Sequence, residues 1–222
     1  MNRKYAVALL LFLCLSFAAC CINSGENAGD TFSEGDNCSY EVSTDVLEIF
    51  SDENHISVKY PSFETDGECC TRINQLIEHA LNDYIIASYG KDYSGLTISA
   101  DYEIMHINNE YASIVIRGTS NVSSAAHPIK FAFAVNIVME SKQYDEKSGM
   151  ISIDNTLAQQ VVDFAKTQSN SAVEVYFEQF TLESIKDLLQ RDDVFFYRVD
   201  KGLGIIIPVP HSIGDYVEFQ IG

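Results

Sequence analysis

The chain contains five histidines, which are the side chains best suited to acid–base or ligand chemistry: His55, His79, His106, His127 and His211. A catalytic histidine needs one group that orients it and a nucleophile or water within reach. Ser123 and Ser124 precede His127, but no Gly-x-Ser-x-Gly turn surrounds them. Because no catalytic motif is complete, we expect neither enzyme activity nor a bound cofactor or metal ion.

His127 stands between a run of small residues and a long apolar stretch, in the segment SSAAHPIKFAFAVN. Pro128 pushes the residue before it into extended geometry, so a tight turn that feeds a strand explains His127. Contact with a ligand is the alternative, and we take His127, Pro128 and His211 as a candidate binding cleft. A hydrolase would need His127, His211 and an aspartate around one open cleft.

The N-terminus predicts export. Arg3 and Lys4 precede the apolar run 6–19, which has the length of a signal peptide. Ala18, Ala19 and Cys20 resemble the lipobox of prokaryotic lipoproteins, although Cys21 leaves the modified cysteine ambiguous. An ordinary secretory signal cut after residue 19 is the alternative. We expect a signal peptide over 1–19, a lipid on Cys20, and anchoring to the extracytoplasmic face of the cell membrane.

The chain of 222 residues has a formal net charge of −18. Such a surface repels nucleic acid and attracts cationic partners, most strongly at low ionic strength. The acidity also has a simpler explanation, because it keeps an exported protein soluble.

Four cysteines remain beyond the signal and Cys20, namely Cys21, Cys38, Cys69 and Cys70. They allow three pairings, which the sequence does not distinguish. A disulfide from Cys38 to Cys69 or Cys70 would join the N-terminal segment to the first helix. A metal site made by Cys69, Cys70 and His79 has no familiar spacing.

Composition divides the chain into three parts. Residues 20–50 begin acidic and rich in Gly, Ser and Asn, which predicts a flexible tether. Residues 51–222 are long enough for one domain with its own core, with an N-terminal part over 51–142 and a C-terminal part over 143–222.

Hydrophobic periodicity predicts the elements of this domain. A strand begins at His55 and ends at Pro61, and a helix with one apolar face runs over 69–90. Alternating residues predict strands over 96–107, 110–120, 129–141 and 150–153. Helices over 155–166, capped by Asn155 or Thr156, and over 175–190, as one bent helix or two, precede strands that close the chain. The fold class is α+β: an antiparallel sheet packed on one face by two or three helices, in the order strand–helix–meander then helix–strand–strand.

The order of several motifs resembles a known exported domain. The motifs are VKYPSF, INQLIEHAL, AAHP, a strand leading into SGMISI, and FFYRVDKGLGIII running into PHSIG. Over about 50–222 the chain resembles the domain that precedes the catalytic part of PdaC-type peptidoglycan deacetylases and forms the extracellular part of RsiV-type anti-sigma factors. This domain is described as domain of unknown function 4163 followed by domain of unknown function 3298. The family usually has Gly-Gly-Ala-His-Pro where this chain has Ser124-Ala125-Ala126-His127-Pro128.

The resemblance implies a binding role. In that family the deacetylase chemistry belongs to a separate domain with a His-x-x-x-His motif, and this chain has no such motif. The anti-sigma relatives bind lysozyme. We therefore expect a non-catalytic envelope lipoprotein that binds a peptidoglycan-like glycan or a cationic protein such as lysozyme. The alternative is a stand-alone envelope hydrolase or deacetylase, or an accessory domain of one.

Overall fold

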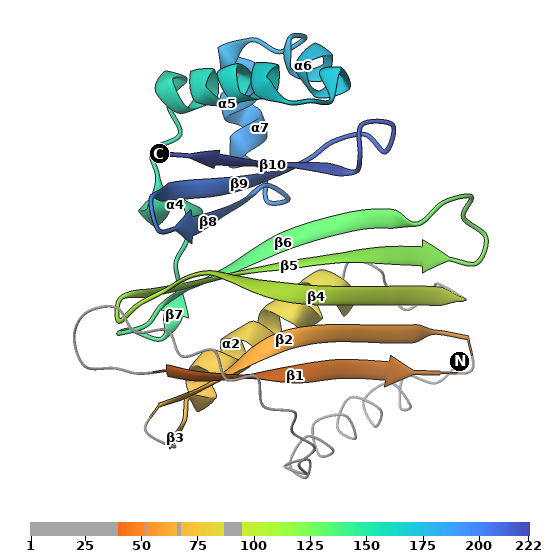
Figure 1. Cartoon of the computed structure of the whole chain (residues 1–222), viewed down its shortest axis with the longest axis vertical. Helices are drawn as coiled ribbons and strands as arrows, with labels where there is room; N and C mark the ends of the chain where they lie inside the picture. The colour runs from red at the N-terminus through yellow and green to blue at the C-terminus, as the bar shows by residue number, and fades with distance from the viewer. Residues whose placement is uncertain (1–39, 52, 66–67, 87–94) are drawn as a thin grey trace, which may run out of the picture.

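The computed structural model describes residues 40–51, 53–65, 68–86 and 95–222, which form two β-sheets stacked on each other with helices on the outer face of each (Figure 1). The predicted signal peptide, Cys20, Cys21 and Cys38 lie outside the described residues. Within these ranges no helix is both long enough and apolar enough to cross a membrane.

The first sheet has the order β1-β2-β4-β5-β6-β7, with β3 paired to β2. Its strands are β1 (Tyr40–Phe50), β2 (His55–Thr65), β3 (Glu68–Cys69), β4 (Leu96–Ile107), β5 (Tyr111–Val122), β6 (Ile129–Val138) and β7 (Gln143–Tyr144). Helix α2 (Thr71–Leu81) and the π-helical turn η1 (Asn82–Ile86) connect the β2–β3 hairpin to β4.

The second sheet consists of β8 (Phe195–Val199), β9 (Gly202–Pro208) and β10 (Tyr216–Ile221) in the order β10-β9-β8. Short helix α4 (Lys147–Met150) leads from the first sheet to α5 (Asn155–Thr167), α6 (Ser171–Phe177) and α7 (Leu182–Gln190). Figure 1 shows these last three helices over the second sheet and α2 against the first.

The α+β class predicted from the sequence is confirmed, and the structure adds two features. The strands divide into two sheets, and β2 pairs with β4 in parallel while the other pairs are antiparallel. The parallel pair has a physical reason: a crossover through a helix brings the chain back to the same end of the sheet before the next strand begins.

The predicted tether is too long at its C-terminal end. Residues 40–50 form β1, which pairs with β2 along its whole length from Tyr40 opposite Thr65 to Phe50 opposite His55. Tyr40, Val42, Leu47 and Ile49 pack against the first core. The alternation of these apolar residues is a strand pattern that the polar composition of the preceding segment obscured.

Strand β2 also continues past Pro61, where the sequence predicted its end. Parallel pairing with β4 stops at Val58, so Pro61 has a ladder partner on one side only, the edge position where proline is tolerated. Beyond it, Asn74 of α2 accepts the Phe63 amide N–H at 2.9 Å and donates to the Phe63 carbonyl at 3.2 Å. The helix thus supplies hydrogen bonds that a neighbouring strand would otherwise make.

The structure corrects two local predictions and decides between the two alternatives of a third. The cap of α5 is Asp154, whose carboxylate accepts the Leu157 N–H, instead of Asn155 or Thr156. The 175–190 segment is two helices, because Thr181 caps α7 separately. Residues 147–150 form a helix and 151–153 no strand, so the strand predicted over 150–153 is wrong.

Three apolar clusters stabilise the layers. The first lies between α2 and the first sheet, the second between the second sheet and α5–α7, and the third between the two sheets. Residues 112–116 of β5 are all buried, because α2 covers one face and the second sheet covers the other. Tyr197 is fully buried over Gly204, where a Cβ atom would lie 1.8 Å from the tyrosine ring, so this position requires glycine.

Two polar side chains join the sheets. Ser113 of β5 donates its hydroxyl to Asn136 Oδ1 at 2.7 Å, and the same Ser113 oxygen accepts the Arg198 N–H at 3.0 Å. Asn136 of β6 donates Nδ2–H to the Phe196 carbonyl at 2.6 Å. We call Ser113 and Asn136 the inter-sheet pair; it satisfies backbone groups of β8 that face the first sheet.

Replacing Asn136 with alanine should lower the free energy of unfolding by about 1–3 kcal/mol, because the Ser113 hydroxyl and the Phe196 carbonyl then lose partners in a partly buried site. Urea unfolding at neutral pH measures the change. The matched control is Asn121→Ala, since Asn121 is exposed on β5. Equal losses in the two variants would contradict a special role for the inter-sheet pair.

Candidate functional site

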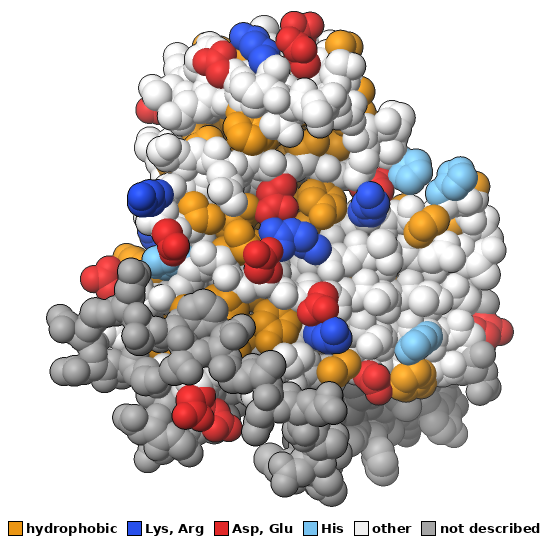
Figure 2. Space-filling view, viewed as in Figure 1, with side chains coloured by type: hydrophobic (Ala, Val, Ile, Leu, Met, Phe, Trp, Pro, Cys, Tyr) orange, Lys and Arg blue, Asp and Glu red, His pale blue; other side chains and the backbone are white. Residues whose placement is uncertain are grey.

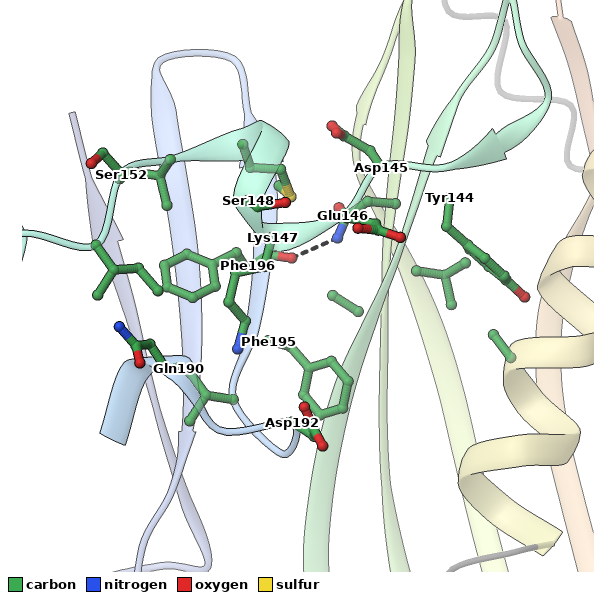
Figure 3. A pocket seen from close by; sticks show the side chains of 18 residues that line it. Tyr144, Asp145, Glu146, Lys147, Ser148, Ser152, Gln190, Asp192, Phe195 and Phe196 are labelled. Carbon is green, nitrogen blue, oxygen red and sulfur yellow. Dashed lines mark hydrogen bonds between the residues drawn. The ribbon is translucent and has the colours of Figure 1, made fainter. Parts of the chain in front are cut away.

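An open cavity of about 740 Å³ lies where the first sheet meets the second (Figure 3). One side is formed by β6 and the segment from β7 through α4, and the other by the chain that leaves α7 and enters β8. Its volume lies within the range of about 300–1,000 Å³ typical of small-molecule sites.

The inner wall combines aromatic and aliphatic surface with a few polar groups. Phe195 and Phe196 come from β8, and Ala134 and Asn136 come from β6. The dashed line in Figure 3 is the hydrogen bond from Asn136 to the Phe196 carbonyl, so Asn136 of the inter-sheet pair also forms part of this wall. The hydroxyl of Tyr144 at the edge of the cavity donates to the Leu76 carbonyl at 2.7 Å and fixes that ring against α2.

Two basic side chains hold the walls in place. Arg198 donates Nε–H and Nη2–H to Asp145 Oδ2 at 3.0 and 2.7 Å, and its guanidinium lies 3.8 Å from the centre of the Tyr111 ring. Lys147 donates to the carbonyls of Leu189 and Arg191 at 3.0 and 2.7 Å, at the C-terminal end of α7. Burial lowers the pKa of Lys147, while the charges of nearby Asp192 and Asp193 partly offset the effect. These contacts make the cavity a fixed feature of the fold.

The mouth of the cavity carries carboxylates and hydroxyls. Glu146, Asp192, Ser148 and Ser152 line it and are exposed. Among the described residues, neither Glu146 nor Asp192 forms a hydrogen bond or ion pair with another side chain. These groups can accept hydrogen bonds from ligand hydroxyls or amines, and the aromatic wall can pack against an apolar ring face.

A charged cluster also crosses between the sheets. Arg117 of β5 donates two hydrogen bonds to Glu218 of β10, at 3.1 and 2.6 Å, and one to Glu103 at 2.9 Å. Tyr197 donates its hydroxyl to Glu218 at 2.5 Å. Figure 2 shows acidic and basic side chains gathered at the middle of this face, between the two layers.

The environment of Glu218 shifts its pKa in a definite direction. Burial alone would raise the pKa of Glu218, but the hydrogen bonds from Arg117 and Tyr197 and the charge of Arg117 hold it below its ordinary value. Burial and the hydrogen bond to Glu218 raise the pKa of Tyr197 far above its usual range. The cluster is therefore ionised as Arg117⁺ and Glu218⁻ at neutral pH and ties the two sheets electrostatically.

The structure brings His127 and His211 together. Their ring centres are 5.9 Å apart and their planes differ by 18°. The Nδ1 atom of His211 lies 2.7 Å from Asp215 Oδ1. His127 belongs to the turn between β5 and β6, and His211 to the turn between β9 and β10. Figure 2 shows two histidines side by side at the edge of the molecule.

The candidate cleft of His127, Pro128 and His211 stays a prediction. His127, Pro128 and His211 are all exposed, and the cavity at the sheet junction is lined by other residues. The predicted turn that feeds a strand is present, since residues 123–128 connect β5 to β6. The exposed His127 side chain contacts the His211 ring outside the three apolar clusters.

The cysteine predictions stay predictions. Cys38 is not among the described residues, and of Cys69 the structure describes the backbone in β3. Cys70 precedes α2 and packs against the first core. His79 lies on the exposed side of α2 and pairs with Asp83 at 2.9 Å. Among the described residues, no three side chains of ligating type converge on a metal position.

Sequence reasoning missed the cavity. Its residues come from β6, from the segment after β7 and from the start of β8, which periodicity assigns to separate elements. The segment YDEKSG lies between the strands predicted over 129–141 and 150–153, and no motif in it indicates a binding site. A signal was present in Asp145 and Lys147, two charges of opposite sign that become partly buried at the junction.

No protein family model and no curated protein match the chain. It is similar to the crystal structure of a DUF3298 family protein from Pseudomonas aeruginosa PAO1, with 13% identity and a TM-score of 0.46, over 84% of this chain and 91% of that chain. It is also similar to a DUF3298 family member from Bacteroides fragilis NCTC 9343, with 12% identity and a TM-score of 0.45, over 81% of this chain and 90% of that chain. The resemblance to the PdaC/RsiV-type domain stays a prediction.

The substitution Glu218→Gln should destabilise the protein by about 1.5–3 kcal/mol at pH 7, because it removes a charge-assisted contact with Arg117. A carboxylate whose folded pKa is lowered contributes stability above its unfolded pKa, and that contribution is lost as the pH falls through the folded pKa. The difference between the two proteins should therefore shrink below about pH 4. Chemical denaturation at a series of pH values measures it.

The matched control is Glu103→Gln, since Glu103 also contacts Arg117 but its side chain is 62% exposed. We expect a change below about 1 kcal/mol for that variant. A Glu218→Gln difference of the same size at pH 7 and pH 3 would contradict the ionised cluster.

Proposed function

We propose that this chain is an exported lipoprotein whose folded part binds a peptidoglycan-like glycan at the cell envelope without catalysing a reaction on it. The observation that carries the proposal is the cavity at the sheet junction. The lipobox-like N-terminus supports the location, and the PdaC/RsiV-like resemblance supports the class of ligand. Residue Cys20 anchors the chain to the extracytoplasmic face of the membrane, and the tether before β1 separates the anchor from the binding domain.

The cavity suits a sugar for three reasons. Its volume of about 740 Å³ accommodates a short oligosaccharide. Phe195 and Phe196 offer apolar surface to the C–H face of a pyranose ring, and the exposed Glu146, Ser148 and Asp192 offer hydrogen bonds at the mouth. Aromatic surface combined with a few polar groups is the usual composition of small-molecule sites.

A cationic protein such as lysozyme is the second candidate, and the net charge of −18 favours it. The end of α7 adds exposed carboxylates at Asp187, Asp192 and Asp193 beside the cavity mouth. Complementary charge accelerates association and is weakened by salt. A stand-alone hydrolase or deacetylase has less support, because His127, His211 and Asp215 lie on exposed turns and the cavity is lined by other residues.

A bulky residue at the cavity mouth should block glycan binding. We expect the unmodified chain to bind a soluble muropeptide or an N-acetylglucosamine oligomer, and Ser148→Trp to weaken that binding at least tenfold by filling the mouth. Isothermal titration calorimetry measures the affinities. The chain contains no tryptophan, so the new indole also reports on its own environment. The matched control is Ser171→Trp, on the exposed N-terminus of α6.

Lysozyme distinguishes the two candidates in the same assay. Salt-sensitive binding of lysozyme, together with no affinity for either glycan probe, would reject glycan binding and favour the cationic partner. Absence of binding to lysozyme and to both glycans would reject both candidates.

The lipid anchor has a separate test. Cys20→Ser should abolish incorporation of labelled fatty acid and move the protein from the membrane fraction to the soluble fraction, because the thiol is the acceptor of the lipid. Cys21→Ser is the control and should keep both properties. If the second variant alone loses the lipid, Cys21 is the modified residue; if the unmodified chain incorporates no fatty acid, it is not a lipoprotein.

A further inference from the structure

The turn after β5 and the turn after β9 place two imidazoles next to each other. His127 and His211 are 84 positions apart in the sequence, yet their rings face each other with centres 5.9 Å apart. Both side chains are exposed, and among the described residues no hydrogen bond joins either Nε2 atom to another group. Two imidazole nitrogens are therefore available to solvent on the same side of the molecule.

The hydrogen bond with Asp215 determines which ring nitrogen of His211 carries the proton. Asp215 Oδ1 lies 2.7 Å from Nδ1 of His211, and an ionised carboxylate can only accept, so Nδ1 carries the proton of this hydrogen bond. The neutral ring then has its lone pair on Nε2. A histidine that binds a metal through one nitrogen commonly donates its other N–H to a carboxylate, which orients the ring and makes the ligand more basic.

The carboxylate is itself held in place. Asp215 Oδ2 accepts the Lys130 N–H at 2.9 Å, and the Asp215 carbonyl accepts the Val209 N–H at 2.9 Å. The Asp215 side chain is 9% exposed, and its backbone has a φ of 75°. Because Lys130 is the second residue of β6 while Val209 follows β9, Asp215 joins the two turns that carry the histidines and sets their relative position.

We propose that His127 and His211 form a binding site for a divalent transition-metal ion such as Ni²⁺ or Zn²⁺, with both Nε2 atoms as ligands and Asp215 as the positioning residue of His211. An imidazole ligand holds the ion about 2 Å from its nitrogen, so two rings on one ion have centres about 5–6 Å apart. The observed separation agrees with this geometry, and the exposed His127 ring is free to turn its Nε2 toward the ion.

The proposed site leaves some coordination positions of the metal ion open. Two histidines supply two ligands, and water or a group from a partner supplies the rest, which leads us to expect micromolar affinity. Imidazole suits Ni²⁺, Cu²⁺ and Zn²⁺ better than Ca²⁺ or Mg²⁺, which prefer oxygen. The acidic surface of the chain adds a general attraction for cations. The site does not depend on the glycan proposal, because it uses none of the cavity residues.

Titration of the full chain, free of any affinity tag, with Ni²⁺ and Zn²⁺ in chelator-free buffer tests the proposal. Calorimetry should show one site, and His127→Ala and His211→Ala should each weaken it at least tenfold without lowering the melting temperature. Asp215→Asn should weaken it about tenfold, because the amide orients His211 less well than the carboxylate. No binding below about 1 mM, or binding that survives the double histidine variant, would overturn the proposal.

The chain provides a matched control in His79. His79 pairs with Asp83 at 2.9 Å with the same i,i+4 spacing as His211 and Asp215. It has no second histidine against its ring among the described residues. His79→Ala should leave Ni²⁺ affinity unchanged; an equal loss in this variant would show that any exposed His–Asp pair suffices and would refute the paired site.

A measurement on the unmutated chain tests the metal site without variants that could fail to fold. Five histidines give five sets of ring proton signals, and paramagnetic Ni²⁺ broadens those nearest to it. Two of the sets, assigned to His127 and His211, should broaden first at substoichiometric Ni²⁺. Uniform broadening of all five sets would contradict a specific site.

Discussion

The hydrogen bonds of Ser113 and Asn136 set the position of the second sheet on the first. Ser113 is fully buried, and its hydroxyl both donates to Asn136 and accepts from Arg198. An unpaired polar group in this layer would cost about as much as a lost hydrogen bond, so the two sheets satisfy these groups in one register only. The Arg117–Glu218 contact fixes the same interface from another strand pair. Apolar contacts at this interface favour stacking of the sheets, and the polar ones determine the register.

That register creates the cavity. Asn136 holds the Phe196 carbonyl from one side, and Arg198 of the same strand holds Asp145 on the segment that leaves the first sheet. Between these two attachments the chain from Asp145 to Ile153 crosses from one sheet toward the helices of the other. The layers are joined at discrete points, and the space between them opens to solvent. A binding site at this place follows from the way in which two separately built layers are connected.

The sequence predicts individual layers better than their stacking. Alternation in β4 and the apolar stripe of α2 each arise from one element meeting one core, and periodicity alone predicts both. The continuous burial of residues 112–116 depends on a second sheet that begins more than seventy residues later, and no local pattern indicates which residues cover it. The strand position of Pro61 is equally hard to predict from the sequence. Strand β2 can contain this proline only because its pairing with β4 ends before residue 61. Of the candidate site residues, the sequence singled out His127 and His211, while the partnership of His211 with Asp215 required the closed turn.

The two candidate sites lie at opposite ends of one strand. Lys130, at the beginning of β6, binds Asp215 near the histidine pair, and Asn136, six residues later, belongs to the cavity wall. A strand rises about 3.3 Å per residue, so about 20 Å separate these two points of β6. A ligand in the cavity and an ion on the histidines would therefore not touch. Both sites nevertheless depend on the position of the second sheet relative to β6. Phe196 belongs to β8 of that sheet, and Asp215 belongs to the turn between β9 and β10. A change at the inter-sheet pair should thus affect both sites at once, whereas a change in either site should leave the other intact.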